Sequence, residues 1–211
     1  VRDIALIAAL TQERNLLLRR QGAQVDQDRE RHLGDQHDSD FFLLMEAWKD
    51  AADHTYDLDR CKRLGIHAGS ARQVGRAFAY FLRLAESEGL PLEQKPAAPE
   101  QIRRCLMMGF SDQLAHCIDA GTGRYALVHG RTGILDRESA VRGRPLITAA
   151  EVHEIGHSRM ESTVRLNWIT AVDESWLQED FPDDFQDRTE TIWDETGKRV
   201  TVRRQRLFRD L

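Results

Sequence analysis

His153, Glu154 and His157 match HExxH, the pattern of zinc metallopeptidases. On a helix, two histidines at this spacing point the same way and bind one zinc ion, and the glutamate serves as general base. The context favours a strand instead, because residues 146–150 are rich in β-forming side chains and a further strand-like stretch begins at Thr163. We interpret the match as part of a strand and its turn, and keep a zinc-dependent hydrolase as an alternative.

Other patterns that carry chemistry are missing from the sequence. It contains no GxxxxGK[ST] loop, no GxGxxG and no GxSxG, so we predict no nucleotide-hydrolysing site, no resident cofactor and no catalytic residue in this chain. Cys61, Cys105 and Cys117 form no CxxC pair. An odd cysteine count without metal-ligand spacing indicates a reducing compartment, and we expect the cytoplasm.

The first part of the chain has the periodicity of helices. Apolar residues recur at steps of three and four in three stretches, which begin near Ile4, Phe41 and Val74. Ser70 and Gln73 suggest a capping box, and residues 19–40 are polar enough to predict a long loop. Ile102 opens one more predicted helix, which we expect to end near residue 118.

Beyond residue 120 the pattern changes to short segments rich in β-forming residues. Strands are predicted at 125–129, 146–150 and 163–169, and in the last of these Arg165 and Asn167 alternate with apolar residues. Residues 189–193 and 199–206 flank Glu195-Thr196-Gly197, which we predict to be a hairpin turn. Five or more short strands in this length predict a small closed barrel.

Charge is unevenly distributed along the sequence. The net charge is -5, which argues against a dedicated high-affinity nucleic-acid binder. Residues 173–187 nevertheless contain seven acidic side chains without Lys or Arg, and residues 197–209 contain six Lys or Arg without an acid. The basic stretch is interpreted as a solvated face, or as one that follows a phosphate backbone or docks on an acidic surface.

A series of segments resembles the C-terminal region of bacterial DEAH-box RNA helicases of the HrpB type. In the first half they are Asp3–Leu10 with Leu16–Arg20, Gly34-Asp35 with Asp40–Leu44 and Ala47-Trp48, Leu64–His67 with Arg72–Val74, and Ile102–Phe110. In the second half they are Arg124-Tyr125 with His129-Gly130, Ser139–Val141 with Gly143–Pro145, Ile169–Val172 with Trp176-Leu177 and Phe181-Pro182, and the tail Trp193-Asp194, Gly197–Val200 and Arg203-Arg204. Gln36 stands where the family has histidine.

The resemblance implies an α+β chain with two domains. Residues 1–118 would form an all-helical, ratchet-like, helicase-associated domain, and residues 119–211 an OB-like β-barrel with an HrpB-type tail. The chain lacks an initiating Met and opens inside a periodic segment, so we expect a piece of a longer protein. The implied function is that of a non-motor fragment of an ATP-dependent RNA helicase, whose RecA-like motor domains, with their ATP and Mg, are other parts of the polypeptide and are its partners.

Such a fragment needs arginines at phosphates and flat side chains against bases. Our candidates for contact with single-stranded RNA or DNA are Arg72 and Arg76 in the helical part, and Arg124 and Arg131 in the barrel. We expect this binding to be weak, and expect no membrane partner. Of the four tryptophans, three are predicted to be core residues. A protein-interaction module that touches no nucleic acid remains the other alternative.

Overall fold

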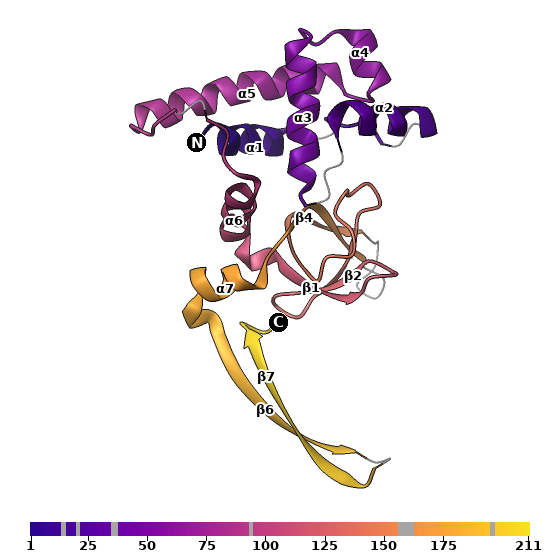
Figure 1. Ribbon diagram of the computed structural model, residues 1–211, viewed down its shortest axis with the longest axis vertical. Helices are drawn as coiled ribbons and strands as arrows, with labels where there is room; N and C mark the ends of the chain where they lie inside the picture. The colour runs from indigo at the N-terminus through magenta and orange to yellow at the C-terminus, as the bar shows by residue number, and fades with distance from the viewer. Residues whose placement is uncertain (14–15, 20–21, 35–37, 93–94, 156–162, 195–196) are drawn as a thin grey trace.

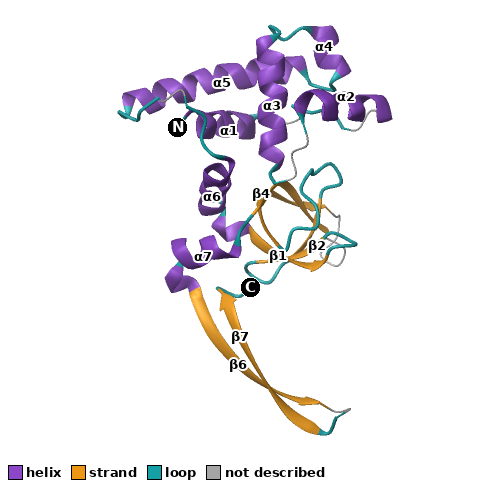
Figure 2. Ribbon diagram, in the orientation of Figure 1, coloured by secondary structure: helices purple, strands orange, loops and turns teal. Residues whose placement is uncertain are grey.

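A computed structural model describes residues 1–211 apart from 14–15, 20–21, 35–37, 93–94, 156–162 and 195–196. The chain is mixed α+β (Figures 1 and 2). The helices that precede the barrel are α1 (Arg2–Gln12), α2 (Ala23–Leu33), α3 (Asp40–Asp53), α4 (Leu58–Arg63), α5 (Ala68–Ser87) and α6 (Pro99–Gly109). The barrel strands are β1 (Leu114–Asp119), β2 (Arg124–Leu127), β3 (Thr132–Leu135), β4 (Leu146–Ile155) and β5 (Thr163–Ala171). After them come α7 (Glu174–Asp180), β6 (Phe185–Asp194) and β7 (Arg199–Phe208). In the described part of the chain, none of the helices has the length and apolar character needed to cross a membrane.

One apolar core joins α1, α3 and α5. Phe41 and Val74 are fully buried in it, and α5 packs along both α1 and α3. Trp48 closes the α3–α5 contact: its indole N–H donates to the carbonyl of Ala71 at 3.0 Å, and its ring meets Phe78 edge-on at 5.3 Å. The helical spacing of apolar residues in the sequence therefore corresponds to the observed buried faces.

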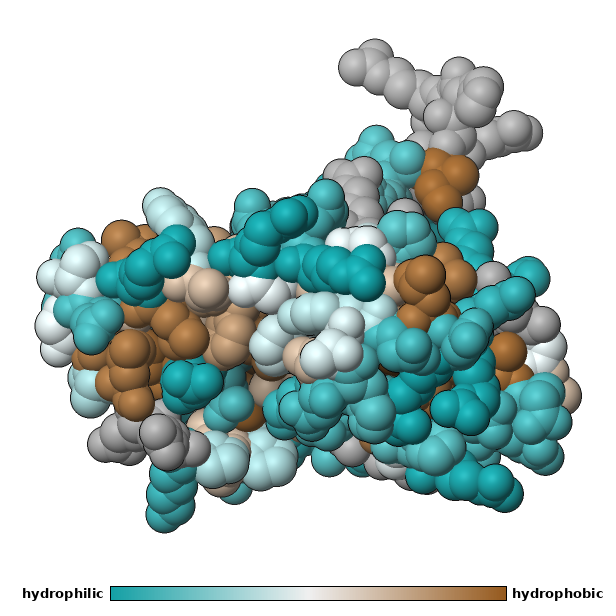
Figure 3. Space-filling model, turned by 90° about the horizontal axis from the view of Figure 1, so that it is seen from above, coloured by the Kyte–Doolittle hydropathy of each residue, from teal (hydrophilic) through white to brown (hydrophobic). Residues whose placement is uncertain are grey.

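The second half of α5 is less well covered. Tyr80, Leu84 and, just beyond the helix, Leu90 are exposed. Figure 3 views the molecule from above, and apolar side chains gather at the end where Figure 1 has the free end of α5 and the N-terminus. The rest of that view is mostly hydrophilic.

Three local predictions for the helical part were wrong. Residues 23–33 form helix α2 instead of a loop, because Arg29 donates to the carbonyls of Leu18, Leu64 and Gly65 and so ties a polar helix to the core. Helix α5 begins with His67 as its N-cap, whose ring accepts from the backbone N–H of Ser70 at 3.0 Å; Ser70 is therefore not the cap. The last helix ends at Gly109, so residues 114–118 belong to strand β1.

The barrel is closed, with strand order β1-β2-β3-β5-β4 and pairing between β1 and β4. Strands β3 and β5 run parallel, while the other neighbours are antiparallel. Its core contains Tyr125, Ile147 and Leu166, all fully buried. Tyr125 donates its hydroxyl to the carbonyl of Arg144 at 2.7 Å, and burial raises its pKa to about 12.

The predicted barrel is confirmed, although its strands are not all the predicted ones. Strands β4 and β5 include the segments expected at 146–150 and 163–169. Strands β1 and β3 were missed, and the boundary expected after residue 118 falls inside β1. The two final strands form a separate two-stranded sheet, β6–β7, and are not part of the barrel.

Candidate nucleic-acid interface

The outer surface of the barrel carries a row of side chains that crosses four strands. In the strand registers Arg124 of β2 faces Ile134 of β3, Ile134 faces Arg165 of β5, and Arg165 faces His153 of β4. Residues opposite one another in a sheet lie on the same face. Tyr125 on β2 points into the core, so its neighbour Arg124 points outward. The row therefore places an exposed isoleucine between two arginines.

Two of these side chains are open to solvent, and Arg165 is half-buried. Arg124 is exposed and Ile134 keeps 39% of its surface accessible. Arg165 has an ion pair with Asp136 at 3.3 Å, and Arg131, in the turn after β2, lies 3.8 Å from Glu154. The Arg131–Glu154 pair is exposed, and exposed pairs contribute little to stability, whereas the Arg165–Asp136 pair is partly buried. Arg124 and Arg131 are thus accessible to phosphate groups.

The turn between β1 and β2 orients Arg124. Asp119 accepts a hydrogen bond from the Thr122 hydroxyl at 2.7 Å and another from the backbone N–H of Gly121 at 2.9 Å, and these bonds lower the pKa of its carboxyl. Gly123 has φ +66, a left-handed conformation that suits glycine. Residues 120–123 thus form a turn that leads directly into β2.

The HExxH match lies partly on β4. His153 and Glu154 belong to this strand, which rules out a helix at residues 146–155, while His157 lies outside the described residues. The His153 Nε2 atom is 2.8 Å from the Glu151 carboxylate. Within the described ranges no group of three or more potential ligands is close enough to hold a metal ion.

Arg72 and Arg76 lie apart from the barrel. Both are exposed on α5, which packs against α1, α3 and α4. Arg72 donates to the carbonyl of Tyr56 at 3.1 Å and lies 5.7 Å above its ring. Thr55 and Tyr56 both have positive φ, so Arg72 holds a strained turn in place. The four predicted arginines therefore fall into two groups on different elements.

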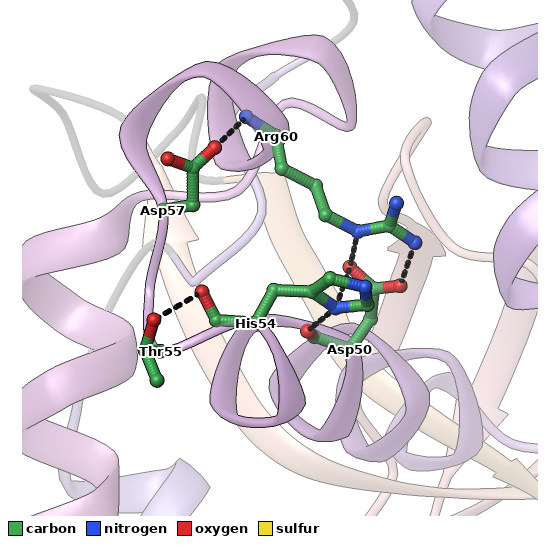
Figure 4. A network of polar contacts seen from close by, with 5 residues as sticks. All are labelled: Asp50, His54, Thr55, Asp57 and Arg60. Carbon is green, nitrogen blue, oxygen red and sulfur yellow. Dashed lines mark hydrogen bonds and ion pairs between the residues drawn. The ribbon is translucent and has the colours of Figure 1, made fainter.

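Next to this turn, Asp50, His54, Asp57 and Arg60 form a polar network (Figure 4). The Arg60 guanidinium binds both carboxylate oxygens of Asp50, with a distance of 2.8 Å for its Nε–H, and this hydrogen bond lowers the pKa of Asp50. Asp57 caps α4 by accepting from the backbone N–H of Arg60 at 2.9 Å. The network fixes α4 against the end of α3.

We expect Asp50→Asn to lower the free energy of unfolding by about 1–2 kcal/mol at neutral pH, because a charge-assisted pair is lost. Since folding lowers the pKa of this carboxyl, its contribution is complete above its ordinary pKa near 4 and disappears as pH falls through the folded value. Urea unfolding of both proteins from pH 7 down to pH 3 measures the difference. Asp53→Asn, at an exposed site on the same helix, is the control; a difference for Asp50→Asn that stays constant with pH would contradict the assignment.

A cavity of about 590 Å³ separates the first helices from the barrel. One side is apolar, with Leu10, Leu17 and Leu44, and the other side carries Glu151 and His153. None of the four predicted arginines lines it, and its acidic residues outnumber its arginines. Arg165 and His153, at one end of the barrel row, also line this acidic cavity, whereas Arg124 and Ile134 do not.

Beside the cavity, the start of α3 is tied to the barrel. Ser39 and Thr170 are both buried and share a hydrogen bond between their hydroxyls at 2.8 Å. The carboxylate of Asp40 accepts from the N–H of Ile169 at 2.7 Å, from the N–H of Ala140 at 2.8 Å and from the Ser139 hydroxyl at 3.0 Å. Burial raises the pKa of Asp40, and these bonds oppose that rise. We call Ser39, Asp40, Ser139, Ile169 and Thr170 the α3 latch.

Sequence reasoning missed Arg165 and the α3 latch. The alternation of polar and apolar residues at 163–169 had already placed Arg165 on the polar side of a predicted strand. The sequence therefore contained the signal that this arginine faces outward from the barrel. The tryptophan prediction is confirmed: Trp48 and Trp168 pack against the helical core, Trp176 is buried, and Trp193 is exposed.

Comparison with known proteins gives one solved structure to report. The chain is similar to the crystal structure of the E. coli DExH-box NTPase HrpB, with 18% sequence identity and a TM-score of 0.45, over 96% of this chain. The chain spans only 25% of that protein's length. No protein-family model and no curated protein matches the sequence.

Proposed function

We propose that this chain is the non-motor, C-terminal part of an ATP-dependent RNA helicase, and that it holds a single strand of nucleic acid on the outer face of its barrel. The observation that carries the proposal is the row Arg124–Ile134–Arg165 on a closed five-stranded barrel, which is exposed at Arg124 and Ile134. A five-stranded barrel that binds oligonucleotides does so on the face of its second and third strands. Arg124 and Ile134 occupy those two strands.

The chemistry of the row fits a single strand of nucleic acid that is bound without recognition of its base sequence. Arginines neutralise phosphates whatever the base sequence, and an apolar side chain between them offers a surface for a base. Because the net charge of the chain is -5, electrostatic attraction to a phosphate backbone is expected at this local face and not over the whole surface. Weak binding by the chain alone follows, and the RecA-like motor domains would close the rest of the channel and supply the ATP hydrolysis.

Titration of a fluorescently labelled oligouridine of about 12 nucleotides tests the proposal. At about 50 mM salt we expect a dissociation constant on the order of 10 µM. One phosphate contact each for Arg124, Arg131 and Arg165 predicts a slope of about -2 for log K against log salt, because single strands give about -0.7 for each contact. Oligoadenosine should bind within a few-fold, and the chain alone should not hydrolyse ATP. Absence of binding at low salt would refute the proposed contact, and a strong base preference would refute binding without readout.

A further inference from the structure

Among the residues that the structure describes, the contacts of the β6–β7 hairpin with the rest of the molecule lie at its base. Phe208 is buried there and contacts Phe181 and Phe185 edge-on, at 5.9 and 5.4 Å. Arg209 adds an ion pair with Asp184 at 2.8 Å. From this base the two strands pair in continuous register and extend away from the barrel as a twisted ribbon (Figure 1). An isolated two-stranded ribbon gains little stability by itself, so its outer half calls for a function other than core packing.

One face of the ribbon combines apolar and basic side chains. Cross-strand partners share a face, so Trp193 lies with Val200, Thr191 with Val202, and Thr189 with Arg204. We call this set the Trp193 face. The exposed fractions of Trp193, Val200 and Val202 are 57%, 60% and 59%. These side chains contribute to no core, and the tryptophan is available for stacking.

Charge on this face indicates the kind of partner. Strand β7 carries arginines and no acid. Nearer the base, Arg206 faces Asp187 and lies 4.6 Å above the ring of Phe185. Arg204 faces the neutral Thr189 and makes no ion pair within the described ranges. An exposed cation without a counter-ion on a strand with no acid fits a polyanion.

The spacing on the face also fits nucleic acid. Trp193 is opposite Val200, four residues along β7 from Arg204, which places the ring and the guanidinium about 13 Å apart along the ribbon. A stacked base at Trp193 and a phosphate at Arg204 would use both groups, since stacking on aromatic rings and phosphate neutralisation are the two means by which single strands are held. A protein partner would need a matching acidic and apolar surface.

We infer that the Trp193 face is a second contact site for single-stranded nucleic acid, with Trp193 stacking on a base and Arg204 neutralising a phosphate. The inference rests on the proposed function and extends it to a strand that reaches beyond the barrel. It assigns the basic C-terminal segment to the phosphate backbone rather than to a solvated face.

The test uses the whole chain, labelled oligouridine and intrinsic tryptophan fluorescence. Trp193→Ala is expected to weaken binding roughly 10-fold and to remove the fluorescence quenching that the oligonucleotide causes. Arg204→Ala is expected to weaken binding a few-fold and to reduce the salt slope by about 0.7. Ile192→Ala and Arg203→Ala, which alter the opposite face, are the matched controls and should change affinity less than two-fold.

The outcomes separate this site from the barrel. If Trp193→Ala binds oligouridine as tightly as the wild type does, and the oligonucleotide does not quench the wild-type fluorescence, the hairpin site is overturned. The barrel proposal is then left intact. Absence of binding by the wild type overturns both. If Trp193→Ala keeps its affinity for RNA but self-associates less than the wild type in sedimentation, the Trp193 face is a protein contact and the inference is refuted. If replacement of Arg124 weakens oligonucleotide binding but the oligonucleotide still quenches the tryptophan fluorescence, the barrel and the hairpin are two separate sites.

Discussion

Asp40→Ala is expected to lower the free energy of unfolding by about 3 kcal/mol. Asp40 is half-buried at the edge of the cavity, and removal of its carboxylate leaves the N–H groups of Ile169 and Ala140 without their acceptor. Each buried donor that loses its partner costs about 1–3 kcal/mol, and water that enters from the neighbouring cavity offsets part of this. Urea unfolding followed by circular dichroism and by tryptophan fluorescence measures the loss.

The two signals provide a second criterion. If Asp40 couples the first helices to the barrel, the two transitions should coincide in the wild type and separate in Asp40→Ala. Asp53→Ala, an exposed site at the other end of α3, is the control and should change stability by less than about 0.5 kcal/mol. A loss below 1 kcal/mol with coincident transitions would show that the carboxylate is not needed for this coupling.

The double variant Arg124→Glu/Arg131→Glu is expected to weaken oligouridine binding roughly 50-fold at low salt. Each reversal removes an attraction to phosphate and introduces a repulsion. Both side chains are exposed, and the only ion pair of Arg131 within the described ranges is the 3.8 Å contact with Glu154, so the fold should be retained. Fluorescence anisotropy with the same oligouridine gives the affinity.

Lys49→Glu/Lys95→Glu reverses two charges elsewhere and serves as the control. Lys49 lies on the exposed side of α3 and Lys95 on the segment between α5 and α6. This pair of changes alters the net charge equally and should weaken binding only a few-fold through long-range repulsion. Equal losses in the two double variants would show that net charge, and not the barrel face, determines the affinity.

The parts of the fold predicted from sequence are those in which one face of a local segment is buried. Helices α3 and α5 and strands β4 and β5 have this character, and their apolar residues repeat at the expected period. Helix α2 was missed because its stability comes from the bonds of Arg29 to carbonyls far along the chain. Strand β3 was missed because it is short and includes Gly133, whose small size accommodates the buried Leu166.

The candidate site was only partly predictable for the same reason. Arg124 and Arg131 were selected as phosphate contacts that the resemblance implies, and they lie on the barrel, whereas the position of Arg165 beside Ile134 becomes apparent only when β3 pairs with β5 in parallel. The role of Asp40 could not be read from the sequence, because its donors lie 99 to 129 positions away along the chain. Assignment of these arginines to nucleic acid remains a prediction.

The α3 latch also has a consequence for biosynthesis. Ser39 and Thr170 are separated by 131 positions, so α3 leaves the ribosome long before the strand that completes the contact. Until β5 closes the barrel, the carboxylate of Asp40 stays hydrated, because the N–H group of Ile169 is not yet in place to donate to it. Closing so long a loop is slow and entropically costly. The relative placement of helices and barrel is therefore among the last features of this molecule to form.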